Sequence, residues 1–180
     1  MARWSMLRKL ATLFPPVPEA GRALAIDPVG VRPDLNRPGY ATLRRGRCSV
    51  PGWCYLVTTV TVDRTPWFAC ADAAMAVTAL QADAALLADA RLLSWVLMPD
   101  HWHGVLQLGS TTSLSRVVNR FKTCTAMRAN ALLKRKGPLW FEGFHDRALR
   151  NELALDRARE YIRMNPVRAG LVSAPERWPW

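Results

Sequence analysis

The stretch of sequence that decides the fold is WVLMPDHWHGVLQL, residues 95–108. Two runs rich in β-branched, aromatic and other apolar residues flank Pro99-Asp100, a dipeptide typical of a tight turn. With the residues just before it, this pattern predicts a strand over 91–98 and a second, antiparallel strand over 101–108. We use this hairpin as the centre from which the rest of the chain is interpreted.

The second strand of the hairpin contains two of the three histidines of the chain. Residues i and i+2 of a strand point to the same face, so His101 and His103 are expected to lie side by side. Trp102, Leu106 and Leu108 should then face the core. Two adjacent imidazoles form half of a metal site, although a pair of surface histidines on a polar strand would give the same pattern.

Upstream of the hairpin, the sequence predicts one strand and one helix. The segment WCYLVTTVTV (53–62) is dense in β-branched and aromatic residues, which favours a strand. Asp72 is the expected N-cap of an alanine-rich helix that runs to about Ala88.

Downstream of the hairpin, we expect two helices separated by a short strand. A helix is expected over about 113–134, and the apolar run 139–141 could be a fourth strand. Asn151 is the expected N-cap of a last helix, which Asn165-Pro166 should end near Met164 because the residue before a proline disfavours helical geometry. The apolar face of the first helix is expected to contain Leu114, Val117, Val118, Phe121 and Met127.

The resulting order, βαββαβ, predicts an α+β fold, namely a ferredoxin-like or RRM-like sandwich. In this arrangement helices pack on one face of an antiparallel sheet and the other face is free for a ligand. Residues 1–38 contain six of the thirteen prolines and are interpreted as an N-terminal extension. The domain itself is expected over 39–180.

Composition favours a nucleic-acid partner. The chain has 180 residues, of which 50% are hydrophobic, enough for one domain with a core. The formal net charge is +11, and 21 of the 25 cations are arginine, which binds phosphate oxygens through a planar fork. The sequence contains no run apolar enough for a membrane span and no CxxC pair, so we expect reduced cysteines, no membrane partner and a cytoplasmic, nucleoid-associated protein.

Two further groups of residues could take part in chemistry. Arg157, Tyr161 and Asn165 are four residues apart and share one helix face. A phenol titrates near ~10 in water, so a nucleophilic Tyr161 would need a nearby cation, metal or base. An ordinary amphipathic tyrosine at a helix end is the alternative. His145-Asp146-Arg147 and Arg150 follow an aromatic stretch, a pattern that fits a single-stranded nucleic-acid groove or a small apolar cluster.

Taken in order, the MPDHWH hairpin, the segment 113–151 and YIRMNPVRAGLV (161–172) resemble the REP-associated branch of single-tyrosine HUH transposases. The resemblance covers roughly residues 40–180. It implies that His101 and His103 bind a divalent metal, Mg²⁺ or Mn²⁺, that Tyr161 is the nucleophile, and that Asn165 is an additional ligand.

The resemblance also implies a function, metal-dependent nicking and rejoining of single-stranded DNA through a 5′-phosphotyrosine intermediate. The expected partner is single-stranded DNA, in particular hairpin-forming repeats, bound by a monomer or a homodimer. Two alternatives remain open: a non-catalytic single-stranded nucleic-acid-binding module, and a metal-dependent nuclease that uses water. The residues expected to contact DNA are Arg120, Lys122, Arg150 and Arg157.

Overall fold

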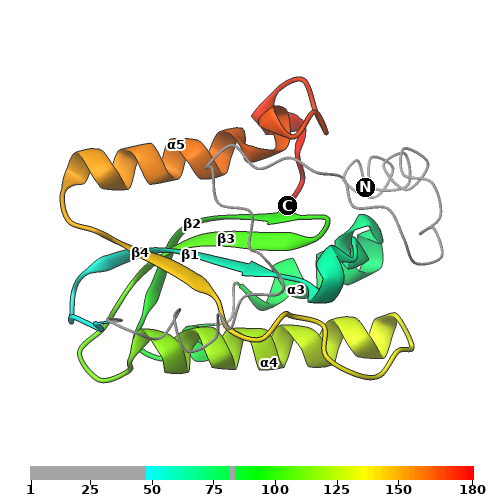
Figure 1. Ribbon diagram of the computed structural model, residues 1–180, viewed down its shortest axis with the longest axis horizontal. Helices are drawn as coiled ribbons and strands as arrows, with labels where there is room; N and C mark the ends of the chain where they lie inside the picture. The colour runs from blue at the N-terminus through cyan, green and yellow to red at the C-terminus, as the bar shows by residue number, and fades with distance from the viewer. Residues whose placement is uncertain (1–47, 82–83) are drawn as a thin grey trace.

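The computed structural model describes residues 48–81 and 84–180. The predicted extension over 1–38, and the start of the predicted domain up to residue 47, therefore lie outside the described residues. The main elements, labelled in Figure 1, are β1 (Cys54–Val60), α3 (Ala71–Leu80), β2 (Arg91–Met98), β3 (His101–Gln107), α4 (Leu114–Leu132), β4 (His145–Leu149) and α5 (Glu152–Arg168).

The four strands form one antiparallel sheet in the order β2-β3-β1-β4. The predicted hairpin is confirmed, since β2 and β3 pair directly around Pro99-Asp100. Strand β1 lies between β3 and β4, with Tyr55 opposite Leu106 on one side and opposite Ala148 on the other. Both the α+β class and the antiparallel sheet are therefore as predicted.

Helices α3 and α4 cover one face of the sheet (Figure 1). A large, almost fully buried side chain in this layer is Trp102, whose ring lies 4.4 Å from that of Phe121 and whose Nε1 donates to Oε1 of Gln81 at 3.0 Å. The indole also covers Gly104, where a Cβ would lie 2.1 Å from the ring. This face is packed so closely that residue 104 has no room for a side chain.

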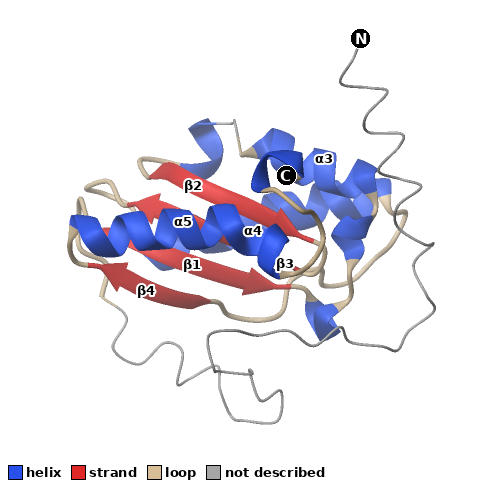
Figure 2. Ribbon diagram, turned by 90° about the horizontal axis from the view of Figure 1, so that it is seen from above, coloured by secondary structure: helices blue, strands red, loops and turns tan. Residues whose placement is uncertain are grey.

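Helix α5 crosses the opposite face of the sheet (Figures 1 and 2), so the expectation that helices pack on one face only is wrong. In a βαββαβ order, the two helices that connect strands pack on one face of the sheet. Helix α5 is not one of these helices, because it follows the last strand. Its buried Ala158 and Ile162 pack with Val96, Met98 and Val105 of the sheet. Burial of this apolar stripe leaves the second face only partly accessible to a ligand.

The fourth strand is β4, not the apolar run at 139–141. Leu139 and Trp140 are buried in the core, and Trp140 makes only an isolated bridge to Thr61. Because β4 is at the edge of the sheet and largely exposed, its sequence HDRAL is mostly polar and lacks the apolar signal of an inner strand.

Helix boundaries also differ from those expected. Cys70 rather than Asp72 occupies the N-cap position of helix α3, without a side-chain hydrogen bond, and the helix ends at Leu80, well before Ala88. Helix α5 begins after the predicted cap Asn151, whose side chain accepts from the backbone N–H of Ala154, but it continues to Arg168 with Pro166 inside it. The missing N–H lies close to the helix end and the proline is buried, so packing offsets the lost hydrogen bond.

Two further findings concern the helices. Met127, expected on the apolar face of α4, is 69% exposed. Thr125 and Ala129 are buried, and Met127 lies two residues from each, so it points to nearly the opposite side of the helix. Within 48–81 and 84–180, no helix has both the length and the apolar character needed to cross a bilayer.

Candidate active site

Strand β3 presents His101 and His103 on the face of the sheet that α5 crosses. Their ring centroids are 4.8 Å apart and the rings stand nearly perpendicular, at 80°. Trp102 between them points to the other face and is buried, as are Leu106 and Leu108. The predicted side-by-side placement of the two imidazoles is thus confirmed.

Each imidazole is held through its Nδ1 atom. Nδ1 of His103 lies 2.7 Å from Oγ1 of Thr58, the residue directly opposite on β1. Nδ1 of His101 lies 2.5 Å from a carboxylate oxygen of Asp100, whose other oxygen accepts from Arg64 at 3.3 Å. In metalloproteins, contacts of this kind to the second ring nitrogen orient histidine ligands and set the tautomer. In this site the two contacts involve Nδ1, so Nε2 is the nitrogen of each ring that they leave available.

The surroundings of His103 favour the uncharged form of its imidazole ring. Burial, reinforced by the neighbouring His101 and Arg64, holds the pKa of His103 well below its usual value. Burial alone would raise the pKa of Asp100, but the hydrogen bond and charge of His101, together with Arg64, lower the pKa overall. A neutral imidazole is the protonation state that a metal ligand requires.

Helix α5 places Tyr161 directly over His103. The phenolic oxygen lies 3.4 Å from Nε2 of His103, and the two rings are 5.2 Å apart in an edge-to-face arrangement. The burial of Ile162 against the sheet anchors this turn of the helix. The structure therefore brings together three of the predicted site residues, although Tyr161 is 58 residues from His103 in the chain.

A cation that the sequence did not suggest lies beside Tyr161. The guanidinium of Arg168 lies over the phenol ring, 5.4 Å from its centroid. Arg157 is exposed on α5, one turn before Tyr161. Asn165 is buried one turn after Tyr161, and its role as a metal ligand stays a prediction.

The predicted DNA-binding residues do not form one group. Arg120 is exposed on α4, on the opposite side of the sheet from α5 (Figure 1). Lys122 on the same helix donates to the carbonyl oxygens of Phe141 and Gly143, at 2.7 and 2.8 Å. Burial lowers its pKa to about 8 against the opposing charge of Glu142. In the structure Lys122 thus holds the loop before β4, and its contact with DNA stays a prediction.

Sequence reasoning missed Thr58, Arg64, Asp100 and Arg168 as members or neighbours of the site. Thr58 lies in a run of β-branched residues that looks like ordinary strand sequence, and Asp100 was assigned to the turn. Only Asp100 gave a usable signal, because it precedes the HxH pair directly and its carboxylate can reach the first ring.

The fold and the site define a class of protein: an α+β domain in which a strand-borne histidine pair faces a helix-borne tyrosine. Residues 50–165, more than half of the chain, match the family described as Transposase IS200 like. The chain therefore belongs to the IS200-like transposase family. This finding confirms the resemblance noted in the sequence.

One solved structure shares the fold of this chain. A REP-associated tyrosine transposase bound to a REP hairpin superposes with a TM-score of 0.60 and 21% sequence identity, over 74% of this chain and 78% of that one. A candidate transposase from Deinococcus radiodurans R1 gives a TM-score of 0.48 and 20% identity, over 66% of this chain and 95% of that one. No curated protein matches the chain.

Proposed function

We propose that this transposase nicks and rejoins single-stranded DNA, in particular hairpin-forming repeats, with Tyr161 as the nucleophile. The observation that supports this most is the 3.4 Å approach of the Tyr161 oxygen to His103 within the histidine pair. Membership of a transposase family and a net charge of +11 are consistent with a DNA substrate.

The donor atoms at this site suit a divalent ion. Both imidazoles are oriented through Nδ1, so their Nε2 atoms can bind metal, and the amide oxygen of Asn165 is a third possible ligand. In the part of the chain that the structure describes, no group of three or more His, Cys, Asp or Glu side chains is arranged so that it could hold a metal ion by itself. Water and phosphate oxygens would complete the shell, which favours Mg²⁺ or Mn²⁺. The bound ion would polarise the scissile phosphate.

The chain's own residues would carry out the transfer. The phenolic proton of Tyr161 leaves to solvent, and the Tyr161 oxygen forms a bond to the phosphorus while the bond from phosphorus to the 3′-oxygen breaks. The departing oxygen takes a proton and becomes a free 3′-hydroxyl, and the other strand end stays attached as a 5′-phosphotyrosine. Attack of a 3′-hydroxyl on this ester reverses the step and rejoins the strands without ATP. Arg168, over the phenol ring, would favour the phenolate.

Tyr161→Phe tests the proposal because it removes only the hydroxyl. Wild-type protein and the variant would be incubated with labelled single-stranded DNA hairpins and Mn²⁺, then resolved on a denaturing gel. We expect a covalent protein–DNA adduct with the wild type and none with the variant, while DNA affinity and melting temperature change little.

The two alternative functions give different results in the same assay. Metal-dependent cleavage by the Phe variant would show that water is the nucleophile. Binding without cleavage by either protein, on all hairpins tested, would indicate a non-catalytic binding module.

A further inference from the structure

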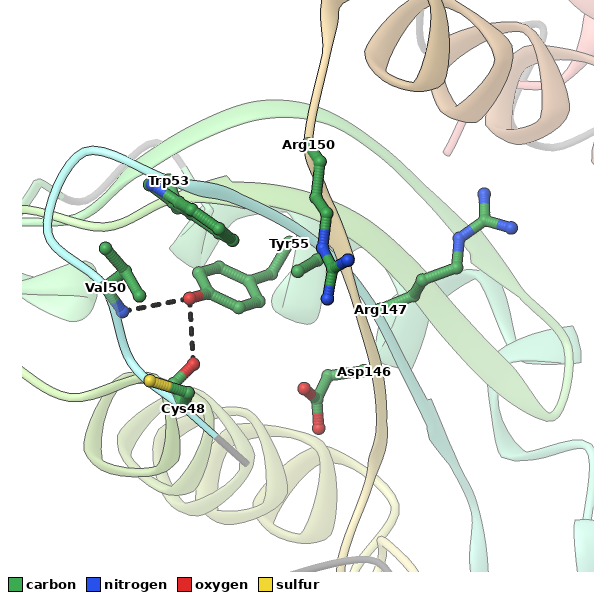
Figure 3. Close-up of a pocket in the computed structure, with 8 residues that line it drawn as sticks. Cys48, Val50, Trp53, Tyr55, Asp146, Arg147 and Arg150 are labelled. Atoms are coloured by element: carbon green, nitrogen blue, oxygen red, sulfur yellow. Dashed lines mark hydrogen bonds between the residues drawn. The ribbon is translucent and has the colours of Figure 1, made fainter. Parts of the chain in front are cut away.

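A second site lies at the edge of the sheet, away from the histidine–tyrosine site. Figure 3 shows a hollow between the start of β1 and the end of β4, with a volume of about 420 Å³, in the range of small-molecule pockets. We call it the edge pocket. Its lining residues are Cys48, Val50, Trp53, Tyr55, Asp146, Arg147, Ala148 and Arg150.

The walls of the edge pocket combine an aromatic ring with a cation. Trp53 is 41% exposed, so its indole presents a large apolar surface to solvent. The guanidinium of Arg150 projects toward the same hollow from the other side (Figure 3). An indole face with a guanidinium nearby is the combination that stacks unpaired bases and binds the adjoining phosphate.

The floor of the pocket is preformed. The hydroxyl of buried Tyr55 accepts from the backbone N–H of Val50 at 2.9 Å and donates to the carbonyl oxygen of Cys48 at 2.8 Å (Figure 3). These two bonds hold the segment before β1 against the sheet, next to Trp53. Because this part of the pocket is already ordered, a ring can bind there without the entropic cost of ordering a loop.

The charge distribution decides which part of a nucleotide would enter. Asp146 also lines the pocket, so its side of the pocket is less favourable for a phosphate group than the side formed by Arg150. Arg147 lies in β4 and points away from Tyr55 in Figure 3, whereas Arg150 directly follows the end of this strand. A base therefore fits inside and its phosphates fit along the strand edge.

Strand β4 connects the edge pocket to the histidine–tyrosine site. Arg147 pairs with Leu56, and His145 pairs with Thr58, the residue that contacts His103. From residue 150 to residue 145 the strand covers roughly 16 Å. Tyr55 and Ala148 of the pocket lie on the face covered by α3 and α4. A DNA strand that passes around the edge strand β4 could therefore place one base in the pocket and a phosphate a few nucleotides away near Tyr161 on the other face.

We infer that the edge pocket binds one unpaired base of the DNA strand that is cleaved, stacked on Trp53 and anchored through its phosphate by Arg150. This inference rests on the proposed DNA substrate. It adds a contact that would set the distance between an unpaired extension and the cleaved phosphodiester.

Binding of two DNA hairpins, measured by fluorescence anisotropy in EDTA, tests the inference. One hairpin is blunt and the other has a single-stranded extension that contains 2-aminopurine at successive positions. We expect Trp53→Ala to weaken binding of the extended hairpin by about tenfold or more, and to abolish the quenching of one 2-aminopurine position. Trp53→Phe should retain most of both signals, and the blunt hairpin should bind all three proteins alike.

Matched variants separate stacking from general effects. Leu153→Ala removes another exposed apolar side chain and should have no effect. Arg150→Gln should weaken binding of the extended hairpin and lower the salt dependence by about one unit of slope, whereas Arg159→Gln removes the same charge outside the pocket and should spare the 2-aminopurine signal.

Two results would overturn the inference. The first is equal affinity of wild type and Trp53→Ala for the extended hairpin, and the second is an equal loss on both hairpins. Either result leaves the Tyr161 assay unaffected, because that assay follows the covalent adduct. Absence of any DNA binding by the wild type would instead contradict the proposed function.

Discussion

The two faces of the sheet have different roles, although the same strands form both. On the face covered by α3 and α4, side chains such as Trp102, Val57 and Phe121 are almost completely buried in one apolar cluster. On the face crossed by α5, a smaller apolar cluster shares the surface with Thr58, His101 and His103. The first face stabilises the fold, and the second holds a polar site against a single helix.

This difference shows how one strand can serve stability and chemistry at once. Residues 101, 102 and 103 alternate between the faces, so a large buried core residue lies between two site residues. Substitutions on one face should therefore change stability and leave site chemistry intact, and those on the other face should do the reverse. The following predictions test that separation, from the largest expected effect to the smallest.

His101→Ala should abolish metal-dependent cleavage, with a loss of at least about 100-fold, because it removes one of two imidazole ligands. The free energy of unfolding should change by less than about 1 kcal/mol, since the ring lies outside the apolar clusters. Gel-based cleavage rates and urea unfolding measure the two quantities. Unchanged cleavage in this variant, and in His103→Ala, would remove the metal assignment.

Trp102→Ala should lower the free energy of unfolding by about 3–5 kcal/mol, because it opens a large cavity against Phe121 and leaves Oε1 of Gln81 without its donor. Urea denaturation followed by circular dichroism gives the value. A loss below about 1 kcal/mol would contradict the assignment of this face to stability. Gly104→Ala provides a second check, because a methyl group there would press into the indole and should also destabilise the fold.

Asp100→Ala should weaken Mn²⁺ binding by about 10- to 100-fold, because the His101 ring loses the carboxylate that orients it. Asp100→Asn keeps a hydrogen-bond acceptor, so its affinity for Mn²⁺ should lie between those of Asp100→Ala and the wild type. Isothermal titration measures both affinities. Glu160→Gln, which removes an exposed carboxylate from α5, is the control and should bind Mn²⁺ as the wild type does.

Stability without metal should decrease as the pH falls from about 7 to about 5. The pKa of His103 is far below its usual value in the folded state, so across this range the unfolded chain takes up a proton that the folded chain does not. The free energy of unfolding then falls by up to about 1.4 kcal/mol per pH unit. His103→Gln in EDTA should show a shallower slope, and an identical slope would contradict a neutral buried ring.

Much of the architecture could be predicted from local sequence. Strand β2 has the predicted bounds 91–98, β3 differs by one residue, and α4 lies within the predicted 113–134. These elements have strong periodic patterns and clear turn or cap residues, so local preference and tertiary packing agree. The histidine pair was predictable for the same reason, because strand geometry alone places residues i and i+2 on one face.

Elements whose formation depends on distant partners were not predictable. Strand β4 has a polar sequence, and it is a strand only because the exposed edge of β1 offers backbone partners. Pro166 remains helical because its ring is buried. Thr58, Arg64 and Arg168 have no distinctive pattern, and their proximity to the site results from strand register and helix packing.

The sequence by itself determined the hairpin, the helix that follows it, the two-histidine motif and the tyrosine-bearing helix, because each follows from the side chains of a few neighbouring residues. Only the tertiary structure decided which face α5 covers and which atoms surround each ring. The physical reason is that burial of the apolar stripe of α5 against Val96, Met98 and Val105 sets its position on the sheet. That packing, between segments far apart in the chain, is what places the Tyr161 oxygen beside His103.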